Sequence, residues 1–197
     1  MGTTARHVFA LDPESKRIRL VAEADCRGRL ASTPQRRIVG PDGPEHLWVL
    51  DPPADRFHAR AVQLPPGHWS AELVWATDTR GGLSYTADAR GPFFSYSQSA
   101  GFRSLGQTLL APTGAMANTA DGRVFGFRGA DMAKLFSFHP HTREQADLGV
   151  AASAIGRRRY GYALADAVTG RHGEIVFGEN DNGGHLRLYF PRILARV

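Results

Sequence analysis

The chain has 197 residues and a mass of 21.5 kDa, enough to bury a hydrophobic core as one domain or two small ones. Hydrophobic residues at 42% and charged residues at 22% exclude a mainly disordered chain, and a formal net charge of +5 favours anionic partners. No stretch approaches the roughly 20 apolar residues of a membrane span. No secretory signal is visible, and the single cysteine, Cys26, excludes a disulfide framework.

Taken in chain order, five segments repeat one pattern of alternating apolar residues that ends in a turn. They are HVFALDP at 7–13, HLWVLDP at 46–52, PFFSYSQ at 92–98, KLFSFHP at 134–140 and HLRLYFP at 185–191. Alternation with a period of two, with many Val, Ile, Phe, Tyr and Trp residues between Gly-rich and Pro-rich turns, predicts short strands joined by tight turns. We therefore expect an all-β protein.

The spacing of the repeats predicts the architecture. Four of the segments follow another strand-like segment that contains glycine, and three precede a further apolar segment. A repeat of roughly 40–50 residues with four strands is typical of a β-propeller, an array of four-stranded antiparallel blades that must stack to bury both faces. We expect four to five blades in a single domain over residues 1–197. The repeat units lie near 6–24 (partial), 28–65, 68–110, 114–149 and 158–191.

The best-preserved unit, "DGRVFGFRGADMAKLFSFHPHT" from Asp121 to Thr142, resembles the blades of kelch-type and related bacterial propellers. The resemblance covers most of the chain at the level of architecture. It implies the fold and says little about activity. The double glycine followed by spaced Tyr and Trp residues of kelch blades is not reproduced, so no specific family is identified.

Strand counting leaves two arrangements open. Residues 7–13 and 17–24 resemble the third and fourth strands of a blade, whereas the last unit supplies only the first three. The N-terminal strands could therefore complete the last blade and close a small ring, which removes exposed sheet edges. The chain could instead be a partial propeller, and we would then expect it to associate with itself.

One end of the blades should carry the functional loops. Antiparallel alternation places the loop between the second and third strands next to the loop that leads into the following blade. Arg, His, Trp and Tyr gather there, and this set suits an anionic sugar, since Arg binds carboxylates and aromatic rings stack on sugars. The expected ligand-binding residues are His46, Trp69, Arg90, Arg157, Arg158, Glu179 and His185.

These residues predict a binding or interaction scaffold for an anionic carbohydrate or a protein partner. The alternative is an enzyme similar to propeller lyases, which would cleave uronate-containing polysaccharide by β-elimination. His68 or His185 with Tyr160 would then act as base and acid, and Arg158 would neutralise the uronate carboxylate. No known catalytic motif is present. The chain is expected in the cytoplasm, unless it is a piece of a longer exported protein.

Nucleic acid, metals and cofactors are not expected. The basic run GRRRYGY at 156–162 should enter an inner strand, which leaves too few side chains for a nucleic-acid groove. Glu179, Asp181 and Asn182 could offer oxygen ligands to Ca²⁺, but "DNGG" is explained by a hairpin turn. His139 stands where other repeats have Asp, so it is predicted to begin a turn rather than to bind metal with His141.

Overall fold

The structure is a computed structural model of the chain. It describes residues 2–3, 6–24, 29–69, 73–78, 80–109, 111–128, 133–150, 153–154, 159–160, 164–179 and 184–193. Every regular element in these ranges is a β-strand, which confirms the all-β prediction. The same ranges contain no helix with the length and apolar character needed to cross a membrane.

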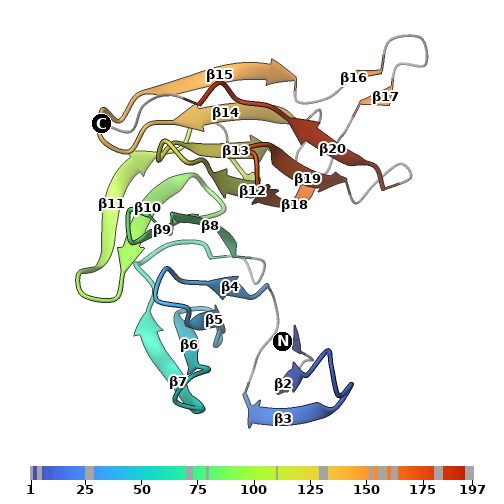
Figure 1. Cartoon of the computed structure of the whole chain (residues 1–197). Coiled ribbons are helices and arrows are strands. Elements are labelled where there is room, and N and C mark those ends of the chain that lie inside the picture. Colours follow the sequence, from blue (N-terminus) through green and yellow to red (C-terminus); the bar gives the residue numbers. More distant parts are fainter. Residues whose placement is uncertain are drawn as a thin grey trace. The chain divides into compact units, whose positions relative to one another are not determined.

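The strands form a series of antiparallel sheets in which each strand pairs with its neighbours in sequence (Figure 1). The first sheet has three strands: β1 (Gly2–Thr3), β2 (His7–Leu11) and β3 (Ile18–Glu23). Three four-stranded sheets follow among the described residues. They are β4 (Ala31–Ser32), β5 (Ile38–Pro41), β6 (His46–Asp51) and β7 (Arg56–Gln63); β8 (Val74–Asp78), β9 (Leu83–Ala87), β10 (Pro92–Ser97) and β11 (Gly101–Gln107); and β12 (Thr113–Asn118), β13 (Val124–Arg128), β14 (Lys134–Phe138) and β15 (Gln145–Val150).

The end of the chain differs from the strand count made on the sequence. β16 (Ser153–Ala154) and β17 (Arg159–Tyr160) form a separate two-stranded hairpin. The last sheet begins only with β18 (Leu164–Thr169), followed by β19 (Ile175–Glu179) and β20 (Leu186–Tyr189). Arg159–Tyr160 were expected in the inner strand of this sheet, but they pair with Ser153–Ala154 instead, and β18 is the strand that pairs with β19.

The chain divides into two compact units, Met1–Leu73 and Val74–Val197. A single domain over residues 1–197, and the completion of the last blade by the N-terminal strands, stay predictions.

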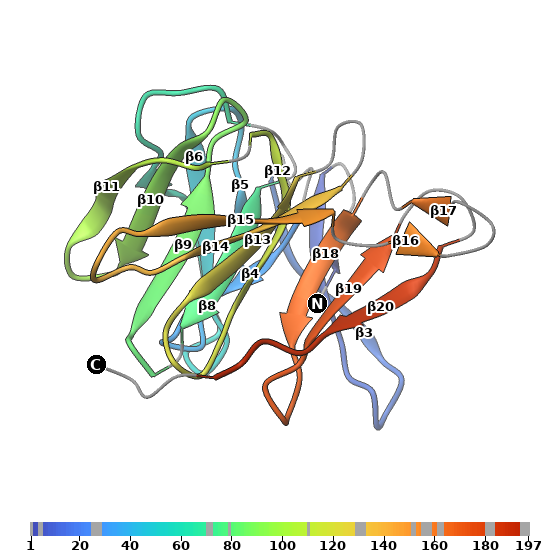
Figure 2. The ribbon, with the colours of Figure 1, turned by 90° about the horizontal axis from the view of Figure 1, so that it is seen from above.

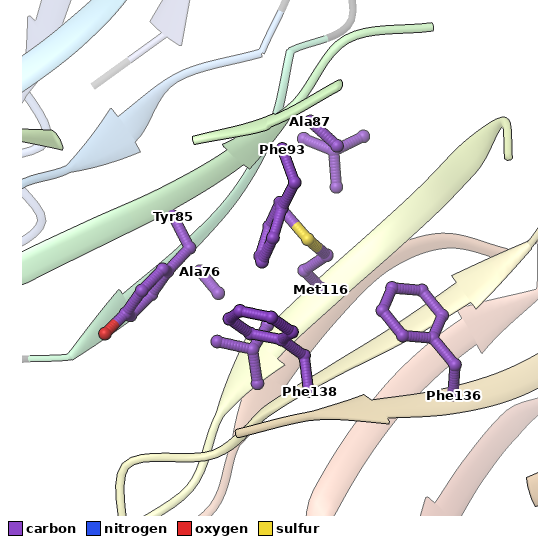
Figure 3. Packing of buried hydrophobic residues seen from close by; sticks show 9 residues of the cluster. Ala76, Tyr85, Ala87, Phe93, Met116, Phe136 and Phe138 are labelled. Atoms are coloured by element: carbon purple, nitrogen blue, oxygen red, sulfur yellow. The ribbon is translucent and has the colours of Figure 1, made fainter. Parts of the chain in front are cut away.

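In the unit Val74–Val197 the hydrophobic core lies between consecutive sheets. Figure 3 shows Tyr85 and Phe93 of one sheet facing Met116, Phe136 and Phe138 of the next. The ring centroids of Phe93 and Phe138 are 4.8 Å apart, in an edge-to-face arrangement. Each sheet thus buries one face against its neighbour, as stacked blades require.

The next core in this unit repeats the arrangement on the other face of β12–β15. Phe125, Phe127 and Leu135 pack there against Ile175 and Phe177 of the last sheet. The first strands of the three sheets, β8, β12 and β18, are in contact one after another, while β18–β20 run side by side as one sheet (Figure 2). This is the order of inner strands in successive propeller blades.

The unit Met1–Leu73 has a core of the same kind. Val8 of the first sheet packs with Trp48 and Leu50 of the second, and all three are at most 3% exposed. Gly40 lies under the Trp48 ring, since a Cβ atom at Gly40 would stand 2.4 Å from that ring. The pairing of a glycine with a large ring recurs at Gly126 and Phe136.

The turns between the third and fourth strands also repeat. The residue that begins the turn accepts a backbone N–H three residues later: Asp12 from Ser15, Ser97 from Ala100 and His139 from Thr142. The fourth residue after it has a positive φ in the four copies where the structure describes it: Lys16, Asp55, Gly101 and Arg143. The prediction that His139 begins a turn is therefore confirmed. The Ser15 hydroxyl, with the Glu14 and Ser15 amides, lowers the pKa of the equivalent Asp12.

The turn between the first and second strands yields a stability prediction. Arg36 has a φ of 60° where the other sheets place Gly82, Gly122 and Gly173. A side chain in this region is strained, and glycine is not. We expect Arg36→Gly to raise the free energy of unfolding by about 0.5–1 kcal/mol in urea denaturation. Gly122→Ala is the matched control and should lower it by a similar amount; a loss of stability in Arg36→Gly would contradict the strain.

Candidate functional site

The loops expected to carry function do meet at one end of their sheets. In the second sheet, the Leu64 amide, just after β7, donates to the Glu45 carbonyl before β6 at 2.8 Å. In the third sheet, the Thr108 amide donates to the Gly91 carbonyl at 2.7 Å. The loop between the second and third strands therefore lies beside the segment that leaves the fourth strand, as antiparallel alternation requires.

Three sheets place a carboxylate at this end, directly after or at the end of the second strand. The backbone amides of Asp42, Asp88 and Glu179 donate to the carbonyls of His46, Pro92 and His185, so the three residues are structurally equivalent. The Asp42 carboxylate accepts the Arg60 backbone N–H, and the Asp88 carboxylate accepts that of Arg90, both at 2.5 Å. Asp42 thus binds the backbone of β7, whereas Asp88 binds the backbone of its own loop.

Glu179 differs because it binds side chains. Its carboxylate is 1% exposed, and Oε2 lies 2.6 Å from Nδ1 of His185 and 3.3 Å from the His185 backbone nitrogen. Nη2 of Arg187 lies 3.5 Å from both carboxylate oxygens. Nε of Arg187 is buried and has no hydrogen-bond partner among the residues that the structure describes. The side chain of His185 is 42% exposed, so a buried carboxylate holds a histidine that faces solvent.

The charges of this group fix the orientation of the histidine. Burial by itself raises the pKa of Glu179, but the hydrogen bonds from His185 and the charges of Arg187 and His185 outweigh it and hold the pKa below its usual range. An ionised carboxylate at Nδ1 keeps a proton on that nitrogen. Nε2, on the far side of the ring, is then the nitrogen available to a ligand or substrate.

The other predicted residues are distributed over both units. His46 and Trp69 are partly buried and His68 is exposed in the unit Met1–Leu73; the Trp69 indole N–H donates to the Pro65 carbonyl at 2.6 Å. Arg90 is exposed in the other unit. Arg157, Arg158, Asp181 and Asn182 lie outside the described residues, as does the side chain of Tyr160. Among the described predictions, the structure thus brings Glu179 and His185 together.

Sequence reasoning missed Arg187. It lies on β20 at the position that holds Trp48 and Phe136 in equivalent strands, where the repeat has a core aromatic residue. Aligning HLRLYFP with KLFSFHP places Arg187 opposite Phe136, and a cation in place of a core aromatic residue could have marked Arg187 as a candidate site residue.

The described residues contain no group of three or more His, Cys, Asp or Glu side chains that could hold a metal ion. The rings of His139 and His141 have centroids 6.0 Å apart, and His139 is engaged in its turn.

Comparisons with known proteins identify the fold. No family model and no curated protein matches the chain. Among solved structures, it is similar to a gluconolactonase from Xanthomonas campestris (13% identity, TM-score 0.62) and to a streptogramin B lyase (13%, 0.61). It is also similar to the extracellular domain of a protein described as a hybrid two-component system from B. thetaiotaomicron (14%, 0.62). These neighbours are β-propellers.

The chain has a β-propeller fold. The matches cover 92%, 94% and 92% of the chain but 65%, 62% and 25% of the three structures, so the chain spans about two thirds or less of their length. At these identities the likeness shows the propeller fold alone, and the kelch resemblance is not confirmed. In the propeller, β8, β12 and β18 are inner strands, and Glu179 lies at the end of the second strand of the last sheet.

Proposed function

We propose that this propeller is a binding scaffold for anionic carbohydrate, with His185 as a ligand contact. The observation that carries the proposal is the 2.6 Å contact between buried Glu179 and exposed His185, which pre-orients Nε2. A preset polar group at a loop end can bond a sugar hydroxyl or carboxylate at little cost in side-chain entropy. The net charge of +5 and the exposed Arg90 favour an acidic polymer. The neighbouring gluconolactonase carries a sugar-derived name.

The test is retention on affinity gels made with uronate-containing polymers. We expect the unmodified protein to be retained and His185→Ala to lose most of its retention. His172→Ala is the matched control, because His172 is also exposed but lies in the turn at the opposite end of the same sheet. Equal retention of His185→Ala and His172→Ala would contradict the proposal. Trp69→Ala with Arg158→Ala tests the other predicted contacts on the same gels.

The Glu179–His185 pair also favours a second candidate, a β-eliminating lyase. A histidine oriented by a carboxylate is a common general base. Nε2 of His185 would remove the proton α to a uronate carboxylate. The electron pair would form the new C=C bond as the glycosidic oxygen leaves and takes a proton from Tyr160, and Arg158 would neutralise the carboxylate. Tyr160 and Arg158 enter this scheme from the sequence alone.

Lyase activity is measured as a rise in ultraviolet absorbance from the unsaturated product. If the scheme holds, His185→Ala should lower the rate by about 10²–10⁴-fold, the usual contribution of a general base. Retention on the gels without any absorbance rise would leave binding as the function and reject the lyase.

A further inference from the structure

The last sheet leaves uncovered a position that the other sheets bury. The second residue of the repeated third-strand segment is Val8, Leu47, Phe93, Leu135 and Leu186 in the five sheets. The first four are at most 4% exposed, and Leu186 is 69% exposed. In the first, third and fourth sheets this residue belongs to the face that packs on the following sheet.

Leu186 belongs to an apolar face that continues across the whole sheet. Val176 pairs with Val168 on one side and with Leu188 on the other, so these three side chains form a row across β18, β19 and β20. Val168 is 62% exposed and Leu188 is 54% exposed. The opposite face, with Ile175 and Phe177, is buried against β12–β15. We call Val168, Val176, Leu186 and Leu188 the outer face.

The first sheet has an uncovered apolar face of the complementary kind. Leu11 is 50% exposed, although Leu50, Tyr96 and Phe138 at the equivalent position are at most 7% exposed. Ile18, which pairs with Leu11, is 70% exposed, and Leu20, which pairs with Phe9, is 54% exposed. We call Phe9, Leu11, Ile18 and Leu20 the leading face. Trp48 and Phe136 stand at the position equivalent to Phe9, and each packs against the sheet that precedes its own.

We propose that the outer face binds the leading face of a second copy of this chain, so that copies join head to tail. The joints inside the chain already pair these two kinds of face: Phe93 with Phe138, Leu135 with Phe177 and Val8 with Trp48 lie in shared cores. A new joint between copies would continue the same series.

The test is the native mass of the full chain by light scattering over a range of concentrations. We expect a mass of at least twice 21.5 kDa that falls on dilution. Leu186→Asp and Leu11→Asp should each give single copies, because a buried unpaired charge opposes either half of the joint. Mixing the two variants should restore a 1:1 complex, since each keeps one intact face. Leu148→Asp is the matched control: it changes another exposed leucine, 44% exposed on β15, and should leave the mass unchanged.

Other outcomes overturn the proposal. Single copies of the unmodified chain at all concentrations would do so, as would an unchanged mass for Leu186→Asp. Two variants that stay single on mixing would contradict a joint between unlike faces, and association of only one of the two variants would indicate a joint between like faces. Leu186 and Leu11 are exposed in one copy, so both variants should fold, which near-ultraviolet circular dichroism verifies. Leu188→Asp gives a second variant of the outer face.

Discussion

Phe136→Ala is expected to lower the free energy of unfolding by about 3–5 kcal/mol, because it removes a large ring from the joint between two sheets. Phe136 is 0% exposed and shares its core with Phe93, Met116 and Phe138 (Figure 3). Its ring also covers Gly126, so the truncation opens a cavity that backbone alone cannot fill. Urea denaturation followed by circular dichroism measures the loss.

Phe190→Ala is the matched control, because Phe190 is 73% exposed and its truncation should cost less than about 0.5 kcal/mol. Gly126→Ala tests the same contact by changing the residue that the Phe136 ring covers. Its Cβ would stand 2.3 Å from the Phe136 ring, and overpacking of this kind costs about 1–3 kcal/mol. If Phe136→Ala and Phe190→Ala lowered the free energy of unfolding by similar amounts, the packing between the two sheets would not be the main source of stability.

Glu179→Gln is expected to lower the free energy of unfolding by about 2 kcal/mol near neutral pH, since hydrogen bonds to a charged group are lost from a buried site. The sign of the pH dependence follows from the lowered pKa of Glu179 in the fold. Its ionised form stabilises the fold fully above the ordinary value of 4.5, and this stabilisation is lost as the pH falls through the folded pKa. The difference between the two proteins should therefore be constant near neutrality and shrink in acid.

Urea denaturation at a series of pH values measures this difference. Glu14→Gln is the control, since Glu14 is exposed and the substitution should change the free energy of unfolding little. A difference between Glu179→Gln and the unmodified protein that persists undiminished in strong acid would show that shape, rather than charge, accounts for the loss. The same variant tests the orientation of His185, because a neutral amide holds Nδ1 less firmly than a carboxylate.

The fold could be predicted because each repeat carries its own turn and strand signals. The Asp-Pro turns and the alternating segments each specify a local hairpin, and five copies leave few other architectures. The sequence failed where a signal was short or ambiguous. β1 was not predicted because it has only two residues. Arg159–Tyr160 was predicted as part of an inner strand, and only its pairing with Ser153–Ala154 shows that it does not belong to the last sheet.

For the candidate site, sequence reasoning reached Glu179 and His185 through the rule that places loops at one sheet end. It could not derive their contact, because the approach of two side chains across a hairpin depends on register and on which face each residue occupies. Arg187 was missed for a different reason. Its position in β20 predicts a core residue, and only the buried carboxylate beside it explains a cation there.

The pairing of strands only with their neighbours in sequence has a consequence for synthesis on the ribosome. In the described residues each sheet can complete its hydrogen bonds from one contiguous stretch, before the next stretch has been made. Local pairing of this kind favours fast folding, one sheet at a time. Until the following sheet arrives, however, the newest sheet presents an apolar face to the surroundings. A growing chain would therefore be most prone to aggregation between two sheets, and a pause in translation at such a point would prolong the risk.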